Sequence, residues 1–459
     1  MKKLIIFFFL VFSWSTKAQL IDSYLANFNR SQNALEACPS TLPEFYFNIV
    51  GPQIEFAYRS NFSVSDLFTS NQEGVKVLDL RNLLSSDLSG NPGFSRLGMD
   101  MAMRHRGIGM GISLGQNFYV YAGTNRHVQL GFDLPTGALA GIDLVGNDVN
   151  LVSGDPNSLS IRALGYYDKH FGFVANTGFI SLGARYRILN GIFTVKTEKG
   201  QLSLDTSQGN KILQNDLLFK VANWNGFNIL DQPVENIPNL SDFFTNTSNR
   251  GQALDFGIGF NLGKAIRLQF AVNNVNAIIN WSENCKTFSS NTGIEYKEPL
   301  IAPAFNSNPI LLFKGLQDTI RTKFELQESS VENFSTTLPV QYLGAVHLKL
   351  HSLLQLGLIY QQRRDNNNSI MPPINNLVSY VQTDWGAFLS GRLMFSLSSN
   401  SSSQLGAFLA VRLIGVQAFA GLSTIGDVIN QKSYSAHVGL SFNLGRRKSN
   451  NTSNSDPQI

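Results

Sequence analysis

The feature that most constrains the fold is a period-two alternation of apolar and polar side chains from Leu254 to Asn273. The alternation breaks once, at Gly263-Lys264-Ala265, and resumes at Ile266. A period of two is typical of a β-strand with one apolar and one polar face. Two such runs around a short break that contains glycine predict a β-hairpin. Each run has about the ~9–11 residues that a tilted strand needs to cross a bilayer.

The same alternation recurs along most of the chain. Clear runs are Arg96–Arg104, Leu159–Tyr167, Phe179–Leu189 and Tyr434–Leu444. Short breaks alternate with long polar connections, an arrangement typical of outer-membrane barrels. The sequence therefore predicts an all-β fold, namely a transmembrane antiparallel β-barrel of about 14 strands that spans residues 45–445.

Two stretches interrupt this pattern. Arg106-Gly107 is predicted to be a turn between two strands, because the alternation restarts after it. Residues 282–336 lack a strand period, and irregular stretches of that length are usually functional or disordered. We therefore expect this segment to be a surface loop or a plug.

The ends of the chain are predicted to lie outside the barrel wall. Residues 1–18 contain Lys2 and Lys3, an apolar run from Leu4 to Trp14, and small residues before a cleavage position. This is the pattern of a secretory signal peptide, which predicts export and, for a barrel, insertion in the cell outer membrane. Residues 19–44 are expected to form an N-terminal segment in the lumen or the periplasm, and residues 446–459 a disordered polar tail.

Charge and hydropathy exclude several classes of protein. The formal net charge is +4, and removal of the leader with its three lysines would lower it to +1, so nucleic-acid binding is not indicated. After the leader, no apolar run reaches the ~18 residues of a transmembrane helix. The two cysteines are Cys38 and Cys285, and an oxidising exported compartment would allow them to pair. The sequence leaves that pairing open.

Three motifs that carry chemistry elsewhere have structural explanations here. Gly111–Gly115 matches G-x-S-x-G but lies in an amphipathic strand, whereas a nucleophile elbow needs a strand-to-helix turn. His347 and His351 are four residues apart, which on a strand separates them by about 13 Å, too far for one metal ion. Gly107, Gly109 and Gly111 are not followed by a helical pattern, so a phosphate-binding loop is not supported. We therefore predict no enzyme activity, no cofactor and no metal site.

Several short segments resemble a known family. They are Phe62–Phe68, Gly165-Tyr166, Leu182–Gly191, Asn274–Trp281 and Thr337–Gly344. Together they make the chain similar to a family of outer-membrane barrels from Bacteroidota that is described as a domain of unknown function. The last two segments also resemble fatty-acid-transporter-like (FadL-like) barrels and the barrel subunit of type IX secretion. The resemblance implies about fourteen strands and an N-terminal segment inside or beneath the lumen, but no settled activity. The chain departs from the family at Ala37-Cys38-Pro39, which replaces an Asn-Pro-Ala-like start.

The polar positions of the alternating strands give a candidate lumen lining. The basic members are Arg162, Arg185, Arg187, Arg267, Lys349, Arg392 and Arg412. The acids on the same faces, Asp100, Asp168 and Asp255, are fewer. The arginines could pair with carboxylates of loops or of a plug. Alternatively, an excess of positive charge in a pore with low-dielectric walls would raise the local concentration of anions.

Three functions remain open at this stage. The first is a channel or transporter for small amphipathic or anionic molecules. The second is a non-transporting barrel that docks or assembles a secretion or surface-protein system. The third is a secreted soluble β-protein, which would need its apolar strand faces packed on each other. The expected partners are outer-membrane lipid, a small hydrophobic or anionic solute and, for the second function, a secretion-system partner.

Overall fold

The computed structural model is built from β-strands. It describes residues 46–60, 68–70, 76–78, 96–114, 117–135, 159–205, 212–223, 248–263, 265–295, 325–330, 333–351, 353–364, 374–385, 388–398, 401–413, 416–422 and 433–445. Within these ranges no helix is long and apolar enough to cross a membrane. The expected signal peptide, N-terminal segment and polar tail lie outside the described residues.

Twenty strands are described, and their bounds follow the chain from end to end. They are β1 (Tyr46–Ser60), β2 (Phe68–Ser70), β3 (Lys76–Leu78), β4 (Arg96–Leu114), β5 (Phe118–Pro135), β6 (Ser160–Asn176), β7 (Ile180–Asp205), β8 (Ile212–Asn223), β9 (Arg250–Leu262), β10 (Ile266–Trp281), β11 (Lys286–Glu295), β12 (Gln327–Ser330), β13 (Phe334–Thr337), β14 (Gln341–His351), β15 (Leu354–Arg363), β16 (Ile374–Trp385), β17 (Leu389–Ser398), β18 (Ser401–Leu413), β19 (Val416–Leu422) and β20 (Ser433–Gly445).

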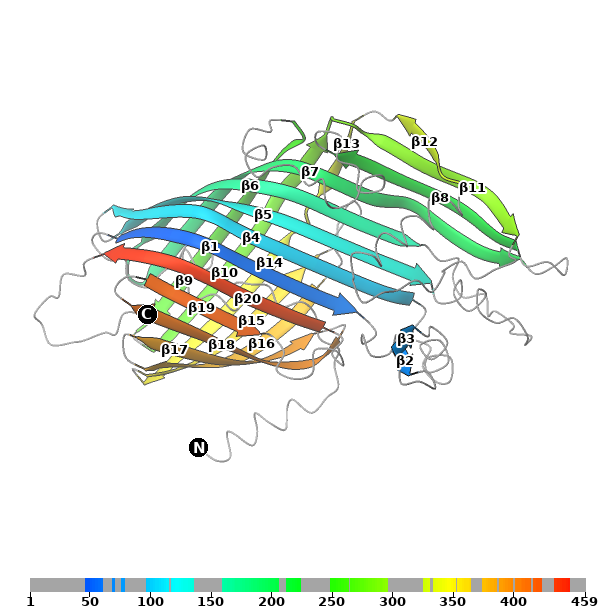
Figure 1. Ribbon diagram of the computed structural model, residues 1–459. Helices are drawn as coiled ribbons and strands as arrows, with labels where there is room; N and C mark the ends of the chain where they lie inside the picture. Colours follow the sequence, from blue (N-terminus) through cyan, green and yellow to red (C-terminus); the bar gives the residue numbers. More distant parts are fainter. Residues whose placement is uncertain are drawn as a thin grey trace, which may run out of the picture.

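Fourteen of the described strands form a closed ring of antiparallel neighbours (Figure 1). The ring runs β1–β4–β5–β6–β7–β9–β10–β14–β15–β16–β17–β18–β19–β20 and returns to β1. Closure depends on β1, which pairs with β20 from Tyr46↔Gly445 onward and with β4 on its other edge. The all-β antiparallel barrel expected from the alternation is therefore confirmed.

The two ends of the ring differ in how the strands are connected. At one end, β4–β5, β6–β7, β9–β10, β14–β15, β16–β17 and β18–β19 are joined by two or three residues. The turn between β9 and β10 contains Gly263, whose φ of 66° is readily adopted by glycine. At the other end most connections are longer, such as residues 136–159 and 423–432. We call these the short-turn end and the long-loop end.

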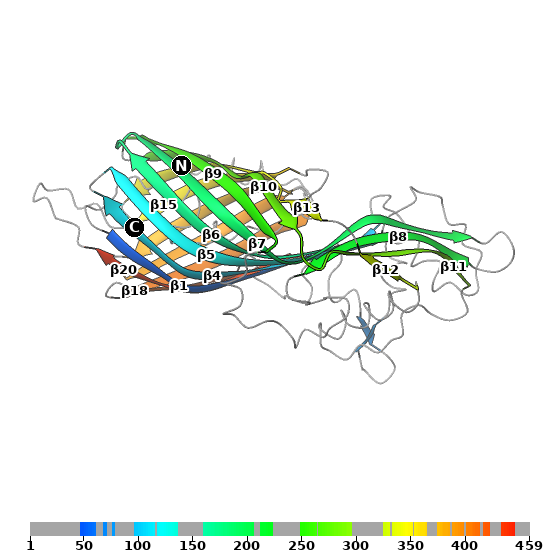
Figure 2. The ribbon, with the colours of Figure 1, turned by 90° about the horizontal axis from the view of Figure 1, so that it is seen from above.

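A second sheet projects beyond the ring at the long-loop end (Figure 2). Its strands are the second half of β7, β8, β11 and β12, paired in that order. β7 belongs to both sheets, because its first half pairs with β9 in the ring and its second half pairs with β8. We call this second sheet the projecting sheet.

The outer face of the ring is apolar, whereas the inner face carries buried side chains, both polar and apolar. On neighbouring positions of one strand, Phe256 is 46% exposed and Asp255 is fully buried. On the opposite side of the ring, Leu393 is 57% exposed and Met394 is buried. Since successive side chains of a strand point to opposite faces, this alternation places the apolar belt outside and the buried side chains inside. The predicted orientation of the hairpin from Leu254 to Asn273 is thus correct.

Two local predictions are wrong. Arg106-Gly107 is not a turn, because β4 runs through it with a register shift between Arg106 and Gly109 against β5. A bulge adds an unpaired residue and so disturbs the alternation without ending the strand. Residues 282–336 are not irregular throughout, since they contain β11, β12 and β13. The run of small polar residues in β11 gives no period-two signal.

Candidate functional site in the barrel interior

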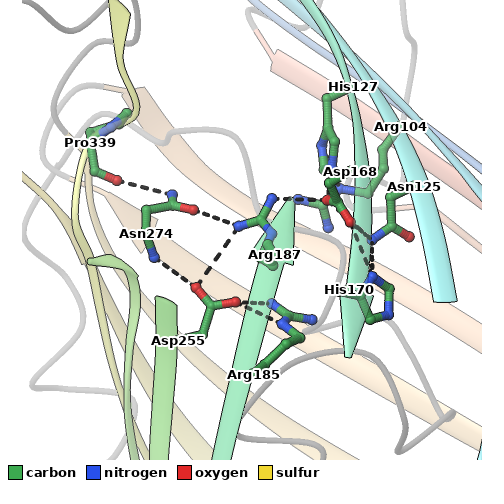
Figure 3. Close-up of polar contacts among 10 residues, drawn as sticks. All are labelled: Arg104, Asn125, His127, Asp168, His170, Arg185, Arg187, Asp255, Asn274 and Pro339. Atoms are coloured by element: carbon green, nitrogen blue, oxygen red, sulfur yellow. Dashed lines mark hydrogen bonds and ion pairs between the residues drawn. The ribbon is translucent and has the colours of Figure 1, made fainter. Parts of the chain in front are cut away.

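A buried ion-pair network lies along one half of the inner face, and Asp168 on β6 is its first centre (Figure 3). Its carboxylate contacts His127 Nε2 at 2.8 Å and His170 Nδ1 at 3.0 Å. It also accepts hydrogen bonds from Asn125 Nδ2 at 3.1 Å and from an Arg187 guanidinium nitrogen at 2.9 Å. Asp168 is only 1% exposed, so these contacts replace the water that a carboxylate would otherwise bind.

Asp255 on β9 is the second centre of this network. Arg185 donates to its Oδ2 from Nε at 2.7 Å, and a second guanidinium nitrogen lies 2.6 Å from the same oxygen. Its Oδ1 accepts the backbone N–H of Asn274 at 2.7 Å and lies 3.8 Å from Arg187. Arg187 therefore links the two carboxylates, and we call the whole set the charged network.

The charged network extends through Asn274 to the next strand pair. The Asn274 side chain accepts from Arg187 at 2.6 Å and donates to the Pro339 carbonyl at 3.0 Å. Its φ is 61°, a left-handed conformation that asparagine tolerates better than most residues. The register between β9 and β10 shifts on both sides of Val275. The bulge thus turns the Asn274 backbone and side chain toward the buried charges.

The contacts define the tautomer of His127. Arg104 Nε donates to His127 Nδ1 at 3.3 Å, so Nδ1 is the acceptor. The other ring nitrogen, Nε2, then carries the proton and donates it to Asp168. A neutral His127 satisfies both contacts, and Arg187 supplies the positive charge that pairs with Asp168.

Strand register explains why these residues meet. Asn125 lies opposite Asp168 between β5 and β6, and Arg185 lies opposite Asp255 between β7 and β9. Directly opposite side chains on one face of an antiparallel pair are close neighbours. We call the strands that carry the charged network, β4–β7, β9 and β10, the charged arc.

An apolar layer covers the charged network toward the long-loop end. It contains Leu164, Tyr166, Leu189, Ala222, Ala253, Ala277, Ile279, Trp281 and Leu338. Trp281 is fully buried and donates its indole N–H to Thr336 Oγ1 at 3.0 Å. Water is therefore excluded from the ion pairs on this side, which strengthens them.

The other half of the inner face carries an apolar cluster. Its members are Ala271, Leu343, Ala345, Ile359, Val378, Tyr380, Met394, Phe408, Ala410 and Phe419, all at most 7% exposed. Apart from Ala271, they belong to β14–β19, which we call the apolar arc. These side chains pack on one another along this half of the inner face.

A polar group lies beside this apolar cluster and is centred on Tyr380. Its hydroxyl contacts His347 Nδ1 and accepts from Gln355 Nε2 at 2.9 Å. The Arg392 guanidinium lies 4.5 Å from the Tyr380 ring centroid and donates to Gln382 Oε1 at 2.6 Å. Arg392 is also the register neighbour of Phe408. A cation therefore adjoins two of the largest side chains of the apolar cluster.

The predicted lumen residues fall into three groups. Arg185 and Arg187 belong to the charged network, and Arg162 pairs with Asp100 at 3.2 Å and Asp133 at 2.5 Å. Arg267, Lys349 and Arg392 are half-buried on the inner face of β10, β14 and β17. Arg412 pairs through its backbone with Gln417, and its side chain lies outside the described residues.

The described carboxylates that pair with Arg162, Arg185 and Arg187 come from other strands of the ring. Sequence reasoning identified Asp100, Asp168 and Asp255 but missed the neutral members of the site, such as His127, Asn274 and Tyr380. His127 and Tyr380 occupy inward positions of alternating strands. A list of inward-facing residues that included histidine and tyrosine as well as the charged residues would have contained His127 and Tyr380.

The other motifs occupy the contexts expected from the sequence. Gly111–Leu114 ends strand β4, and a connection of three residues leads to β5, so no helix follows the G-x-S-x-G serine. His347 and His351 both lie on β14. In the described part of the chain, no group of three His, Cys, Asp or Glu is placed to hold a metal ion. Cys285 is partly buried against the apolar layer, and Cys38 lies outside the described residues.

Comparison with known proteins gives a family match. The model of a family of unknown function (DUF5723) matches residues 39–423. No curated protein matches the chain.

Several solved barrels are similar at low identity. The toluene transporter TbuX of Ralstonia pickettii has 9% identity and a TM-score of 0.42, with 91% of this chain and 92% of TbuX covered. The toluene transporter TodX of Pseudomonas putida has 8% identity and a TM-score of 0.41, with coverage of 94% and 98%. A FadL homologue from Pseudomonas aeruginosa has 9% identity and a TM-score of 0.43, with coverage of 94% and 100%. The family match confirms the resemblance to a family of unknown function that was expected from the sequence.

Proposed function

The chain belongs to the family of unknown function DUF5723, and we propose that it is an outer-membrane channel for small amphipathic molecules, including anionic ones. The outer face of the ring supports a membrane location. Its exposed side chains include Phe171, Leu182, Phe270, Leu393 and Leu409, which are costly to leave in water. The short-turn end would face the periplasm and the long-loop end the exterior, as in other outer-membrane barrels.

The observation that carries the proposal is the two-sided interior. The charged arc and the apolar arc belong to one ring, so a molecule inside it meets both. An amphipathic solute satisfies both surfaces, because its hydrocarbon part removes apolar side chains from water and its polar part replaces lost hydration. A purely hydrophilic solute gains nothing from the apolar arc.

The basic residues near the apolar cluster support a preference for anions. Arg392 borders Phe408 and Tyr380, and a guanidinium suits carboxylate and phosphate groups through its two parallel donors. Arg185 and Arg187 contribute less to this preference, since Asp255 and Asp168 neutralise them. We therefore test this preference at Arg392, which adjoins the apolar cluster.

The experiment is solute flux through purified barrels in liposomes. Three probes of similar size are compared: a short-chain carboxylate, its amine analogue and a neutral sugar. We expect the carboxylate to pass fastest and the sugar slowest. Replacement of Met394 by Gln should reduce the advantage of both amphipathic probes, whereas Arg392→Gln should reduce only that of the carboxylate.

The possible results separate the parts of the proposal. Absence of flux for every probe through correctly folded barrels would reject a channel. Equal flux of sugar and carboxylate would reject amphipathic selectivity, and equal flux of carboxylate and amine would reject the anion preference alone. Leu393→Gln, on the outer face next to Met394, is the matched control and should leave the order of the probes unchanged.

The projecting sheet favours a second candidate function, which is docking of a partner at the cell surface. Its described strands carry exposed ion pairs, such as Lys199–Asp216 and Lys286–Glu328. No large hydrophobic residue of these strands is among the exposed ones. A photo-reactive residue at position 328 would test this function in intact cells. One defined cross-linked partner, together with a barrel that conducts nothing, would favour docking over transport.

A further inference from the structure

Inner-face side chains of the apolar arc cross over a glycine of the adjacent strand. His347, Gly357 and Tyr380 lie opposite one another on β14, β15 and β16. The Tyr380 ring lies over Gly357, since a Cβ added there would be 2.0 Å from Tyr380 Cε1. Its hydroxyl then reaches His347 on the strand beyond. The side chain thus spans β15 and lies along the barrel wall.

The same arrangement recurs on strands β18–β20. Phe408, Gly421 and His437 lie opposite one another on β18, β19 and β20. A Cβ added to Gly421 would be 1.7 Å from Phe408 Cδ1, so the ring occupies the space of the missing side chain. The ring centroids of Phe408 and His437 are 5.6 Å apart. Two large rings of the apolar cluster are therefore held flat by glycines.

A methyl group at either glycine would displace the aromatic ring that lies over it, and only one direction is open to that ring. No real Cβ approaches a ring carbon at these distances, so the ring must give way. The strand backbone lies beneath the ring, and the neighbouring strands close the wall on both sides. The ring can move only away from the wall, toward the interior.

We propose that Gly357 and Gly421 are specificity-determining residues that set how bulky an apolar group the interior admits. They act by letting Tyr380 and Phe408 lie flat against the apolar arc. The proposal rests on the proposed transport function and adds to it a steric limit on the apolar part of the solute. Both glycines are positioning residues, because they act on the solute through the rings.

The test compares Gly357→Ala and Gly421→Ala with the unaltered barrel in liposomes. The probes are carboxylates of equal charge with a linear, a branched or a cyclic hydrocarbon group. We expect flux of the cyclic probe to fall about tenfold, as overpacking a filled site is costly, while the linear probe changes little. Gly344→Ala is the control, since Phe270 on the outer face is 3.7 Å from the added Cβ and ordinary contact results.

Removal of the ring should reverse the effect. Tyr380→Leu in the Gly357→Ala background should restore flux of the cyclic probe, which a general folding defect would not allow. Tyr380→Leu and Phe408→Leu alone keep both glycines, so they test the same limit if the alanine variants do not fold. Each should admit the cyclic probe faster than the unaltered barrel does.

The outcomes distinguish this inference from the function on which it rests. If the unaltered barrel passes no probe, the channel itself is wrong and the steric limit falls with it. If it passes the probes but the ratio of cyclic to linear flux is unchanged in the alanine and leucine variants, only the role of the glycines is overturned.

Discussion

The charged arc and the apolar arc achieve a filled inner face by different means. In the charged arc, Asp168 and Asp255 hold long side chains in place through ion pairs between neighbouring strands. In the apolar arc, packing and two glycines hold the apolar side chains, and polar groups such as those around Tyr380 and Asp384 lie beside them. The difference teaches that one alternation pattern can give, in the same ring, one half linked by ion pairs and another half held by packing.

The two arcs should therefore respond differently to substitution. A buried ion pair depends on both partners, and removal of one leaves a charge without compensation. An apolar cluster loses only the contacts of the atoms removed. Substitutions in the charged arc should therefore lower the stability of the barrel more than substitutions in the apolar arc do. Selectivity is more easily varied in the apolar arc, because the barrel should stay folded.

The largest effect is expected at Asp255. Asp255→Ala would leave Arg185, Arg187 and the Asn274 N–H without their common acceptor, so the free energy of unfolding should fall by about 3–5 kcal/mol. Urea unfolding in detergent, followed by the heat-modifiable shift on gels, measures this loss. A variant as stable as the unaltered barrel would mean that the charged network does not hold the charged arc together.

The next prediction tests whether the outer faces of the two arcs are alike, as expected if the arcs differ only on their inner faces. Leu182 lies on the outer face of the charged arc and Leu393 on that of the apolar arc. Replacement of either by Arg should cost about 2–4 kcal/mol near the bilayer midplane. Unfolding in lipid vesicles should give similar losses for the two variants. A much smaller loss for one would show that its side chain does not face lipid.

A smaller effect is expected for a conservative change in the apolar arc. Ile359→Val removes one methylene group from the apolar cluster and should cost about 0.5–1.5 kcal/mol. Asp255→Asn, which removes one charge at nearly constant shape, is the comparison in the charged arc and should cost clearly more. Similar unfolding midpoints for these two variants would contradict the contrast between the arcs.

The smallest effect is expected where ion pairs are exposed, on the projecting sheet. Lys199 and Asp216 are 3.3 Å apart with largely exposed side chains, so Asp216→Asn should change stability by only about 0–1 kcal/mol. Hydrogen exchange of β7 and β8 amides is a suitable measurement. A loss as large as that of Asp255→Ala would show that burial is not what gives the charged network its strength.

The pH response of the projecting sheet should be equally mild. Burial raises the pKa of Glu198, but the hydrogen bond and charge of Lys196, together with Lys220, outweigh it and hold the pKa below the ordinary 4.5. A lowered pKa contributes stability above the unfolded value and loses it as pH falls through the folded value. Exchange of β7 amides should therefore accelerate only below about pH 4.5. Lys196→Gln should weaken this acceleration, because the pKa of Glu198 in the folded protein would then lie closer to its unfolded value.

The sequence alone predicted those features of the fold that depend on residues close together in the chain. The hairpin from Leu254 to Asn273 was recognisable because alternation and the glycine-containing turn are both local. The bulge in β4 was misread as a turn, since an extra residue and a chain reversal disturb the alternation alike. β11 was missed because Ser289, Ser290 and Asn291 give no contrast between its two faces.

The candidate site was only partly predictable for the same reason. Inward positions of Arg185 and Arg187 follow from alternation, but their partners depend on register between strands far apart in sequence. Arg185 and Asp255 are 70 residues apart, and nothing local relates them. The crossing of Gly357 by Tyr380 likewise exists only once three strands are aligned.

The pairing of β1 with β20 has a consequence for how the protein is made. Residues 46–60 and 433–445 are almost a whole chain length apart, and contacts so distant in sequence form slowly. The ring cannot close until its last thirteen-residue strand has been synthesised. Until then both strands present unpaired backbone edges, which readily recruit other chains. A chain truncated before residue 433 would therefore give an aggregation-prone open sheet rather than a smaller barrel.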